Sequence, residues 1–244
     1  MSDSALSDFA ARSAEARDPQ ELWHVVIAFY ADDDIPMVSY HHFRQGRMQG
    51  VLTETGIKAH GFPADWVTHY LEDHLFEHDP IVALAARTTR PFFWNDIRHL
   101  VELTGAEEAM LRRLEAADLG DGLSMQVVGP NLRNGYVGLG FGGRRPALSD
   151  AMIFELKCAA QIAHLRYCEM VPDDARAAAS LTAREREVLG WIARGKSNAV
   201  IADILRVSRH TVDTLVRRIF DKLGVADRTT AAIKGVGAGL ILPT

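Results

Sequence analysis

The stretch from residue 181 to 228 constrains the fold most, because three short helical patterns follow one another in it, each preceded by a cap or a turn. The third pattern is the clearest. Its apolar residues recur at the spacings of one helix face, namely Val212, Leu215, Val216, Ile219, Phe220 and Leu223. Ser208 stands where an N-cap belongs and Gly224 follows the last apolar residue, so both ends of this helix are marked.

The two preceding patterns fit the same unit. Thr182 and Glu185 have the spacing of a capping box, and Gly195 ends the helix that this box opens. Ser197 is the predicted cap of the next helix, whose inner face holds Val200, Ile201, Ile204 and Leu205. A short helix, a tight turn and a second amphipathic helix are typical of a helix-turn-helix.

The charge of this unit points to double-stranded DNA as a partner. The polar face of the third helix carries donors that suit phosphates and base edges: Arg209, His210, Thr214, Arg217 and Arg218. Residues 180–244 hold 11 Lys and Arg against 6 Asp and Glu, whereas residues 1–179 hold 16 against 26. A basic module on an acidic chain is the footprint of a nucleic-acid binder. The alternative, a helical bundle with a solvated charged face, does not account for this asymmetry.

Length and composition allow two domains. The chain has 244 residues, of which 48% are hydrophobic. It contains no run of 18 apolar residues and begins with a polar segment, so we expect no membrane partner and a cytoplasmic location. A proline and two aspartates after a long helical pattern predict a linker at 171–179, between a first domain at 1–170 and a DNA-binding domain at 180–244.

The first domain alternates helical and strand patterns. Caps and apolar spacing predict helices at 19–29, 63–75, 80–87, 105–118 and 150–170. Strands are predicted at 37–43, 50–55, 123–128 and 136–141, the last two as a hairpin around Asn134-Gly135. Helices on both sides of a mostly antiparallel sheet form an α/β/α sandwich. With the all-α second domain, the chain belongs to the α+β class.

An aromatic cluster in the first domain has two interpretations. Trp66 and Tyr70 are four residues apart and share one helix face, Asp79 begins the next helix, and Trp94 follows in an aromatic segment. Aromatic residues at helical spacing usually form core. However, an indole N–H, a phenol and a carboxylate in an apolar shell are also the groups that orient a small polar ligand.

These residues lead to a family resemblance. The chain resembles the LuxR family of quorum-sensing transcription regulators, which pair an acyl-homoserine lactone receptor domain with a C-terminal helix-turn-helix. The resemblance rests on Trp66, Tyr70, Asp79, Pro80, Trp94 and Gly122, and on Glu185, Leu189 and Gly195. Response regulators share the second set, but they carry a receiver domain with a phosphorylatable aspartate after an apolar strand, and this arrangement is not found near the N-terminus.

The resemblance implies roles for the pocket residues. Trp66 would donate its indole N–H to the lactone carbonyl, and Asp79 would accept the amide N–H of the ligand. Tyr70 and Trp94 would form the walls around the head group.

Two further pocket positions depart from common members of the family. Phe62 stands where many relatives have tyrosine, and Phe141 stands where others carry serine or threonine. Both changes remove a hydroxyl, so the acyl carbonyl of the ligand lacks its usual donor. A water or a side chain of the predicted strand at 37–43 would replace it, with Ser39 and Tyr40 as the nearest candidates.

The sequence therefore predicts a quorum-sensing regulator that binds an N-acyl-homoserine lactone as its ligand, without any other cofactor, and that binds promoters as a homodimer. RNA polymerase is a possible further partner. The alternative is a constitutive DNA-binding or dimerisation protein whose first domain senses no lactone.

Signals for other classes are weak. His74 and His78 have the i, i+4 spacing of a metal site, but a loop before Asp79 would break that geometry. Residues 138–143 match G-x-G-x-x-G, but a dinucleotide site needs a helix to open within the motif, and Arg-Arg-Pro follows instead. Since no nucleophile and base are paired in a suitable context, we predict neither a metal site nor an enzyme.

Overall fold

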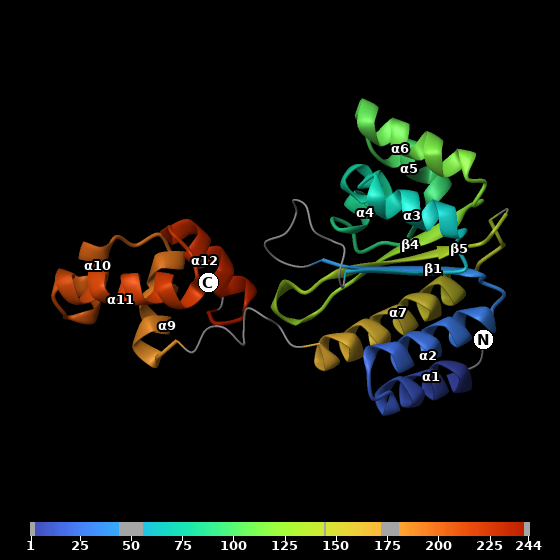
Figure 1. Cartoon of the computed structure of the whole chain (residues 1–244). Coiled ribbons are helices and arrows are strands. Elements are labelled where there is room, and N and C mark those ends of the chain that lie inside the picture. Colours follow the sequence, from blue (N-terminus) through green and yellow to red (C-terminus); the bar gives the residue numbers. More distant parts are fainter. Residues whose placement is uncertain (1–2, 44–55, 144, 172–180, 242–244) are drawn as a thin grey trace. The chain divides into compact units, whose positions relative to one another are not determined.

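The structure, a computed structural model, describes residues 3–43, 56–143, 145–171 and 181–241 (Figure 1). The chain divides into two compact units, one comprising residues 1–129 and 133–170, the other residues 130–132 and 171–244. The predicted linker lies almost wholly outside the described residues, so the domain boundaries stay a prediction. Among the described helices, none is both long and apolar enough to cross a membrane.

The first unit is built on a five-stranded antiparallel sheet with the strand order β2-β1-β5-β4-β3. The strands are β1 (Met37–His42), β2 (Ile57–His60), β3 (Phe92–Phe93), β4 (Gly122–Val127) and β5 (Gly135–Gly140). The predicted hairpin is confirmed, because β4 and β5 pair with Leu123 opposite Leu139. Strand β1 lies on the other side of β5, with Ser39 opposite Gly138.

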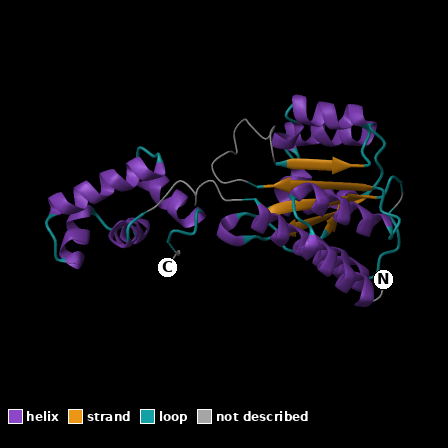
Figure 2. Cartoon of the chain, turned by 60° about the horizontal axis from the view of Figure 1, so that its bottom comes forward, coloured by secondary structure: helices purple, strands orange, loops and turns teal. Residues whose placement is uncertain are grey.

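Helices cover both faces of this sheet (Figures 1 and 2). One face carries α1 (Asp3–Glu15), α2 (Pro19–Ala31) and α7 (Asp150–Met170). The other carries α3 (Ala64–Glu72), α4 (Pro80–Ala85), α5 (Ile97–Leu100) and α6 (Gly105–Ala116), with the short 3₁₀ helices η1 (Leu75–His78) and η2 (Trp94–Asp96). A third 3₁₀ turn, η3, spans Pro130–Leu132. The predicted α/β/α sandwich is confirmed.

The predicted caps explain where the helices of the first unit begin. The Asp18 carboxylate accepts hydrogen bonds from the backbone N–H groups of residues 20 and 21 at 2.8 and 2.9 Å. Thr104 and Glu107 form the reciprocal capping box that opens α6. Ser149 Oγ accepts from the backbone N–H of residue 152 at 3.2 Å. Each cap is worth about 1 kcal/mol, so local chemistry fixes these boundaries.

Some predicted elements differ from the structure. The predicted strand at 50–55 lies outside the described residues, and the edge strand of the described sheet is β2. The predicted helix at 63–75 ends earlier, at Glu72, because His74 adopts a left-handed conformation with φ of 53°. This bend leads the chain through η1 to Asp79. Helix α1 was not predicted, and neither was the last helix of the second unit.

The described part of the second unit contains the three predicted helices and one more: α9 (Ala183–Ala193), α10 (Asn198–Leu205), α11 (Arg209–Leu223) and α12 (Arg228–Gly237). The caps at Thr182, Ser197 and Ser208 are present, and Gly224 closes α11 with φ of 61°. The buried core includes Val188, Leu189, Ile192, Ile201, Val212, Ile219, Leu223 and Ala231. The helix-turn-helix prediction is therefore confirmed.

An ion pair between a buried carboxylate and a partly exposed lysine joins α9 to α11. The side chain of Glu185 is only 2% exposed, and Lys222 Nζ lies 2.7 Å from its Oε2. The same carboxylate accepts the backbone N–H of Thr182 at 2.7 Å. Burial acts to raise the pKa of Glu185, but the hydrogen bonds from Lys222 and Thr182 outweigh it and lower the pKa. Glu185 thus stays charged and serves both as a cap and as a link between helices.

Replacing Lys222 by methionine should speed amide hydrogen exchange in α9 of the full-length protein. The carboxylate of Glu185 would stay buried without its cation, which costs about 1–3 kcal/mol of local stability. Lys222→Arg should keep most of the protection. Lys196→Met, which removes an exposed lysine, is the matched control and should change nothing. Equal protection in Lys222→Met and the wild type would contradict a stabilising role for the ion pair.

Candidate ligand pocket and DNA-binding face

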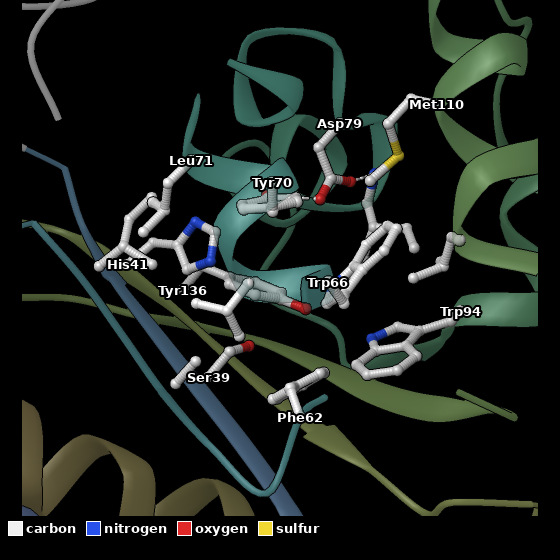
Figure 3. Close-up of a pocket in the computed structure, with 15 residues that line it drawn as sticks. Ser39, His41, Phe62, Trp66, Tyr70, Leu71, Asp79, Trp94, Met110 and Tyr136 are labelled. Carbon is white, nitrogen blue, oxygen red and sulfur yellow. Dashed lines mark hydrogen bonds between the residues drawn. The ribbon is translucent and has the colours of Figure 1, made fainter. Parts of the chain in front are cut away.

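A mainly apolar pocket lies between the sheet and the helices α3, α4 and α6 (Figure 3). Its cavity volume is about 60 Å³, so the space between the lining side chains is narrow. Its lining residues come from both layers: Ser39, His41, Ile57, Ala59, Phe62, Trp66, Val67, Tyr70, Leu71, Asp79, Ile81, Trp94, Met110, Leu114 and Tyr136. The aromatic cluster predicted from the sequence therefore surrounds a space rather than filling a solid core.

Asp79 is the central polar group of this pocket. Its side chain is brought back toward α3 by the turn at His74, and Tyr70 Oη donates to its Oδ2 at 2.8 Å. Its Oδ1 accepts from the backbone N–H groups of Ile81 and Val82 at 2.9 and 3.3 Å, which caps α4. The same carboxylate thus caps the N-terminus of α4 and faces the pocket.

The electrostatics of Asp79 favour a ligand that donates a hydrogen bond. The residue is 7% exposed, and the described lining contains no lysine or arginine. Burial raises the pKa of the carboxyl group, and the hydrogen bonds that it accepts oppose this rise. Burial and the Asp79 charge raise the pKa of Tyr70 well above its usual value, so its hydroxyl stays protonated and donates. A buried carboxylate without a cation is stabilised by each further donor.

The aromatic walls are held by close packing. The rings of Trp66 and Tyr70, one turn apart on α3, have centroids 5.9 Å apart. Trp94 is 5% exposed and lies over Gly122 of β4, where any Cβ atom would overlap the indole. Glycine is required here because the ring approaches the strand backbone. Within the described structure, the Trp94 Nε1 atom is buried and has no hydrogen-bond partner.

Five of the six predicted ligand residues come together in the pocket: Phe62, Trp66, Tyr70, Asp79 and Trp94. Phe141 is not brought to it. The ring of Phe141 packs against Phe93, with centroids 6.4 Å apart, and is absent from the described lining. From β5 the described lining includes Tyr136, and Phe141 stands an odd number of positions after it, so the alternation along the strand places Phe141 on the other side of the sheet.

The strands contribute pocket residues that the sequence did not single out. His41 and Tyr136 line the pocket together with Ser39. Ser39 was a predicted candidate donor, whereas its neighbour Tyr40 faces the other side of the sheet and bonds His164 Nδ1 at 2.8 Å. Burial lowers the pKa of His41 to about 3, so its imidazole is neutral near pH 7. The period of two along β1 and β5 is the signal that could have identified these residues.

The competing motifs lack the geometry that they require. Helix α3 ends before His74, so His74 and His78 do not share a helix face. Within the described residues, no group of three potential metal ligands occurs. Gly138 and Gly140 lie inside β5, and the next helix, α7, does not begin until residue 150.

Helix α11 presents the predicted DNA-contacting residues. Arg209, His210, Arg217 and Arg218 are exposed, and none of the three arginines forms an ion pair with a described residue. Thr214 is half-buried and its hydroxyl donates to the His210 carbonyl at 3.0 Å. These cationic side chains are therefore available to phosphates and bases.

Asp213, on the same helix, has a structural role. Its Oδ1 accepts a hydrogen bond from Asn198 Nδ2 at 2.7 Å. Asn198 begins α10, so this bond joins the two helices of the helix-turn-helix and helps to fix their crossing.

A pocket for a small ligand and a helix-turn-helix in one chain define the class of ligand-responsive DNA-binding regulators. Comparison with protein families gives two matches. Residues 18–167 match the autoinducer binding domain, and residues 179–234 match the bacterial regulatory proteins of the luxR family. The chain belongs to the LuxR family of quorum-sensing transcription regulators, as the sequence resemblance predicted.

Individual relatives agree with this. The transcriptional activator protein AhyR of Aeromonas hydrophila is 31% identical over 194 residues, covering 74% of this chain and 72% of the relative. The quorum sensing-dependent regulator RpaR of Rhodopseudomonas palustris is 28% identical, covering 75% and 74%. The crystal structure of Escherichia coli SdiA has the same fold, with a TM-score of 0.76 at 20% identity over 98% of both chains.

Proposed function

We propose that the pocket binds an N-acyl-homoserine lactone and that this binding controls the association of α11 with promoter DNA. The observation that carries the proposal is the buried Asp79 carboxylate, which faces an apolar space whose described lining holds no cation. An amide N–H is the donor that such a carboxylate can use without a new charge being buried. An acyl-homoserine lactone offers this donor beside an apolar chain.

The head group would be held from three sides. Asp79 accepts the amide N–H, and Trp66 donates its indole N–H to the lactone carbonyl. Tyr70 fixes the carboxylate through its 2.8 Å hydrogen bond, and Tyr70 and Trp94 pack against the ring. This arrangement leaves the polar end of the ligand between α3 and α4.

The acyl chain would lie against the apolar part of the lining, which includes Ile57, Ala59, Val67 and Leu71. Each methylene buried there contributes about 0.8 kcal/mol. The tail thus supplies much of the affinity, whereas the head group supplies orientation.

The wider proposal follows the division of the chain. Residues 1–170 sense the lactone, residues 171–179 link the domains, and residues 180–244 bind DNA. The regulator acts as a homodimer on a roughly palindromic site in the cytoplasm, contacts RNA polymerase, and needs no cofactor or catalytic step. Its family and its exposed arginines on α11 support this proposal.

A thermal-shift titration tests lactone binding. A ligand that binds only the native state raises stability by RT ln(1 + [L]/Kd), so in a series of lactones of increasing chain length the melting temperature should rise with the logarithm of the affinity. Asp79→Asn should lose more of this shift than Tyr70→Phe, because it removes the charge-assisted hydrogen bond to the ligand itself, whereas Tyr70→Phe leaves that bond in place. An equal or smaller loss in Asp79→Asn would contradict the assigned role. A wild-type protein without any shift would favour a constitutive DNA-binding protein.

Arg217 should contact base edges, and Arg218 should contact phosphate. In gel-shift titrations on DNA selected by the wild type from a random pool, Arg217→Ala should cost about 1–3 kcal/mol and relax specificity at one position. Arg218→Ala should weaken all sequences alike and lower the salt slope by about one unit. Arg112→Ala, in the other unit, is the control. Wild-type affinity in Arg217→Ala would refute its placement.

A further inference from the structure

Tyr136 places a hydroxyl on the sheet side of the pocket. The residue lies on β5 and is 3% exposed, and its ring is part of the pocket lining. Figure 3 shows the hydroxyl among the side chains of Ser39, Phe62 and Trp66. The group is therefore within the space that a ligand would fill.

Gly138 makes room for this hydroxyl. Gly138 lies two residues after Tyr136 on the same face of β5. A Cβ atom at position 138 would overlap the Tyr136 hydroxyl and lie 2.6 Å from Ser39 Oγ. A side chain at position 138 and a phenol at position 136 are thus incompatible. This explains why glycine stands at position 138, within the G-x-G-x-x-G match noted in the sequence.

The surroundings of this phenol are polar, and Ser39 Oγ and the Tyr136 hydroxyl both lie next to the space above Gly138. Burial raises the pKa of Tyr136, whereas hydrogen bonding from the side chains of Ser124, Trp94 and Ser39 acts to lower it. The Trp94 Nε1 and Ser124 Oγ atoms have no hydrogen-bond partner among the described residues. An indole N–H can only donate. A phenol hydroxyl donates as well as accepts, so Tyr136 can direct its own proton into the pocket.

Other hydroxyls near the ligand are already used or absent. The Tyr70 hydroxyl donates to Asp79. Ser39 Oγ donates to the Gly138 carbonyl at a long 3.5 Å. Phe62 packs near Trp94, with ring centroids 6.4 Å apart, and has no hydroxyl.

We propose that Tyr136 donates its hydrogen bond to the acyl carbonyl of the ligand, in place of the hydroxyl that Phe62 lacks, and so determines how the acyl group is oriented. The inference rests on the proposed function, since it assumes an acyl amide in the pocket. The ligand class is an acyl lactone whose carbonyl oxygen faces β5.

The test compares lactone affinities of full-length variants by isothermal titration, with N-octanoyl-homoserine lactone as the probe. Tyr136→Phe should raise Kd about tenfold, as expected for a buried carbonyl left unpaired. Phe62→Tyr added to Tyr136→Phe should restore most of this loss, whereas Phe62→Tyr alone should change Kd about twofold or less, because the carbonyl already has a donor. Tyr40→Phe removes a buried hydroxyl from the opposite face of the same sheet and is the matched control.

A second variant keeps the test valid if Tyr136→Phe fails to fold. Gly138→Ala keeps the hydroxyl but displaces it, and it should weaken lactone binding while circular dichroism stays unchanged. If the wild type binds the lactone and both Tyr136→Phe and Gly138→Ala bind it with the same affinity, the role of Tyr136 is overturned, whereas the proposed function is not. If the wild type binds no lactone of any chain length, the proposed function and this inference both fail.

Discussion

The buried carboxylate of Asp79 is the interaction on which the ligand-facing layer depends. It caps α4 through two backbone N–H groups and accepts the Tyr70 hydroxyl from α3, so it fixes two helices against each other. Burying a charge without a cation is costly, and hydrogen bonds are the compensation that the protein provides. A ligand N–H adds to this compensation, which couples occupancy of the pocket to the order of the helices around it.

The sheet separates this pocket from a second, self-contained layer. On β1, Ser39 and His41 face the pocket, whereas Tyr40 faces α7 and bonds His164 Nδ1. Burial lowers the pKa of His164 to about 4, so the imidazole is neutral and its Nε2–H donates to the Arg133 carbonyl at 2.7 Å. Tyr40, His164 and the Arg133 carbonyl on the α7 side thus satisfy one another. On the pocket side, the indole N–H of Trp94 has no partner among the described residues.

Much of this architecture could be predicted from the sequence because caps act locally. Asp18 and Thr104 mark helix starts by their own side-chain hydrogen bonds, and these starts are where the structure has them. Which face of a strand meets the ligand is not local information. A shift of one residue reverses the face, so Phe141 was assigned to the pocket and Tyr136 was missed. Helix α1 was overlooked because its sequence is polar, although it buries Phe9 against the core.

The most direct measurement is the nuclear magnetic resonance signal of the ligand amide itself. N-octanoyl-homoserine lactone labelled with ¹⁵N at the amide can be observed selectively when bound to the full-length protein. If Asp79 accepts the amide N–H, the amide proton should move downfield and exchange slowly with water, and both changes should diminish in Asp79→Asn. A bound lactone whose amide proton keeps its free-solution shift and exchange rate would contradict the central role of this carboxylate.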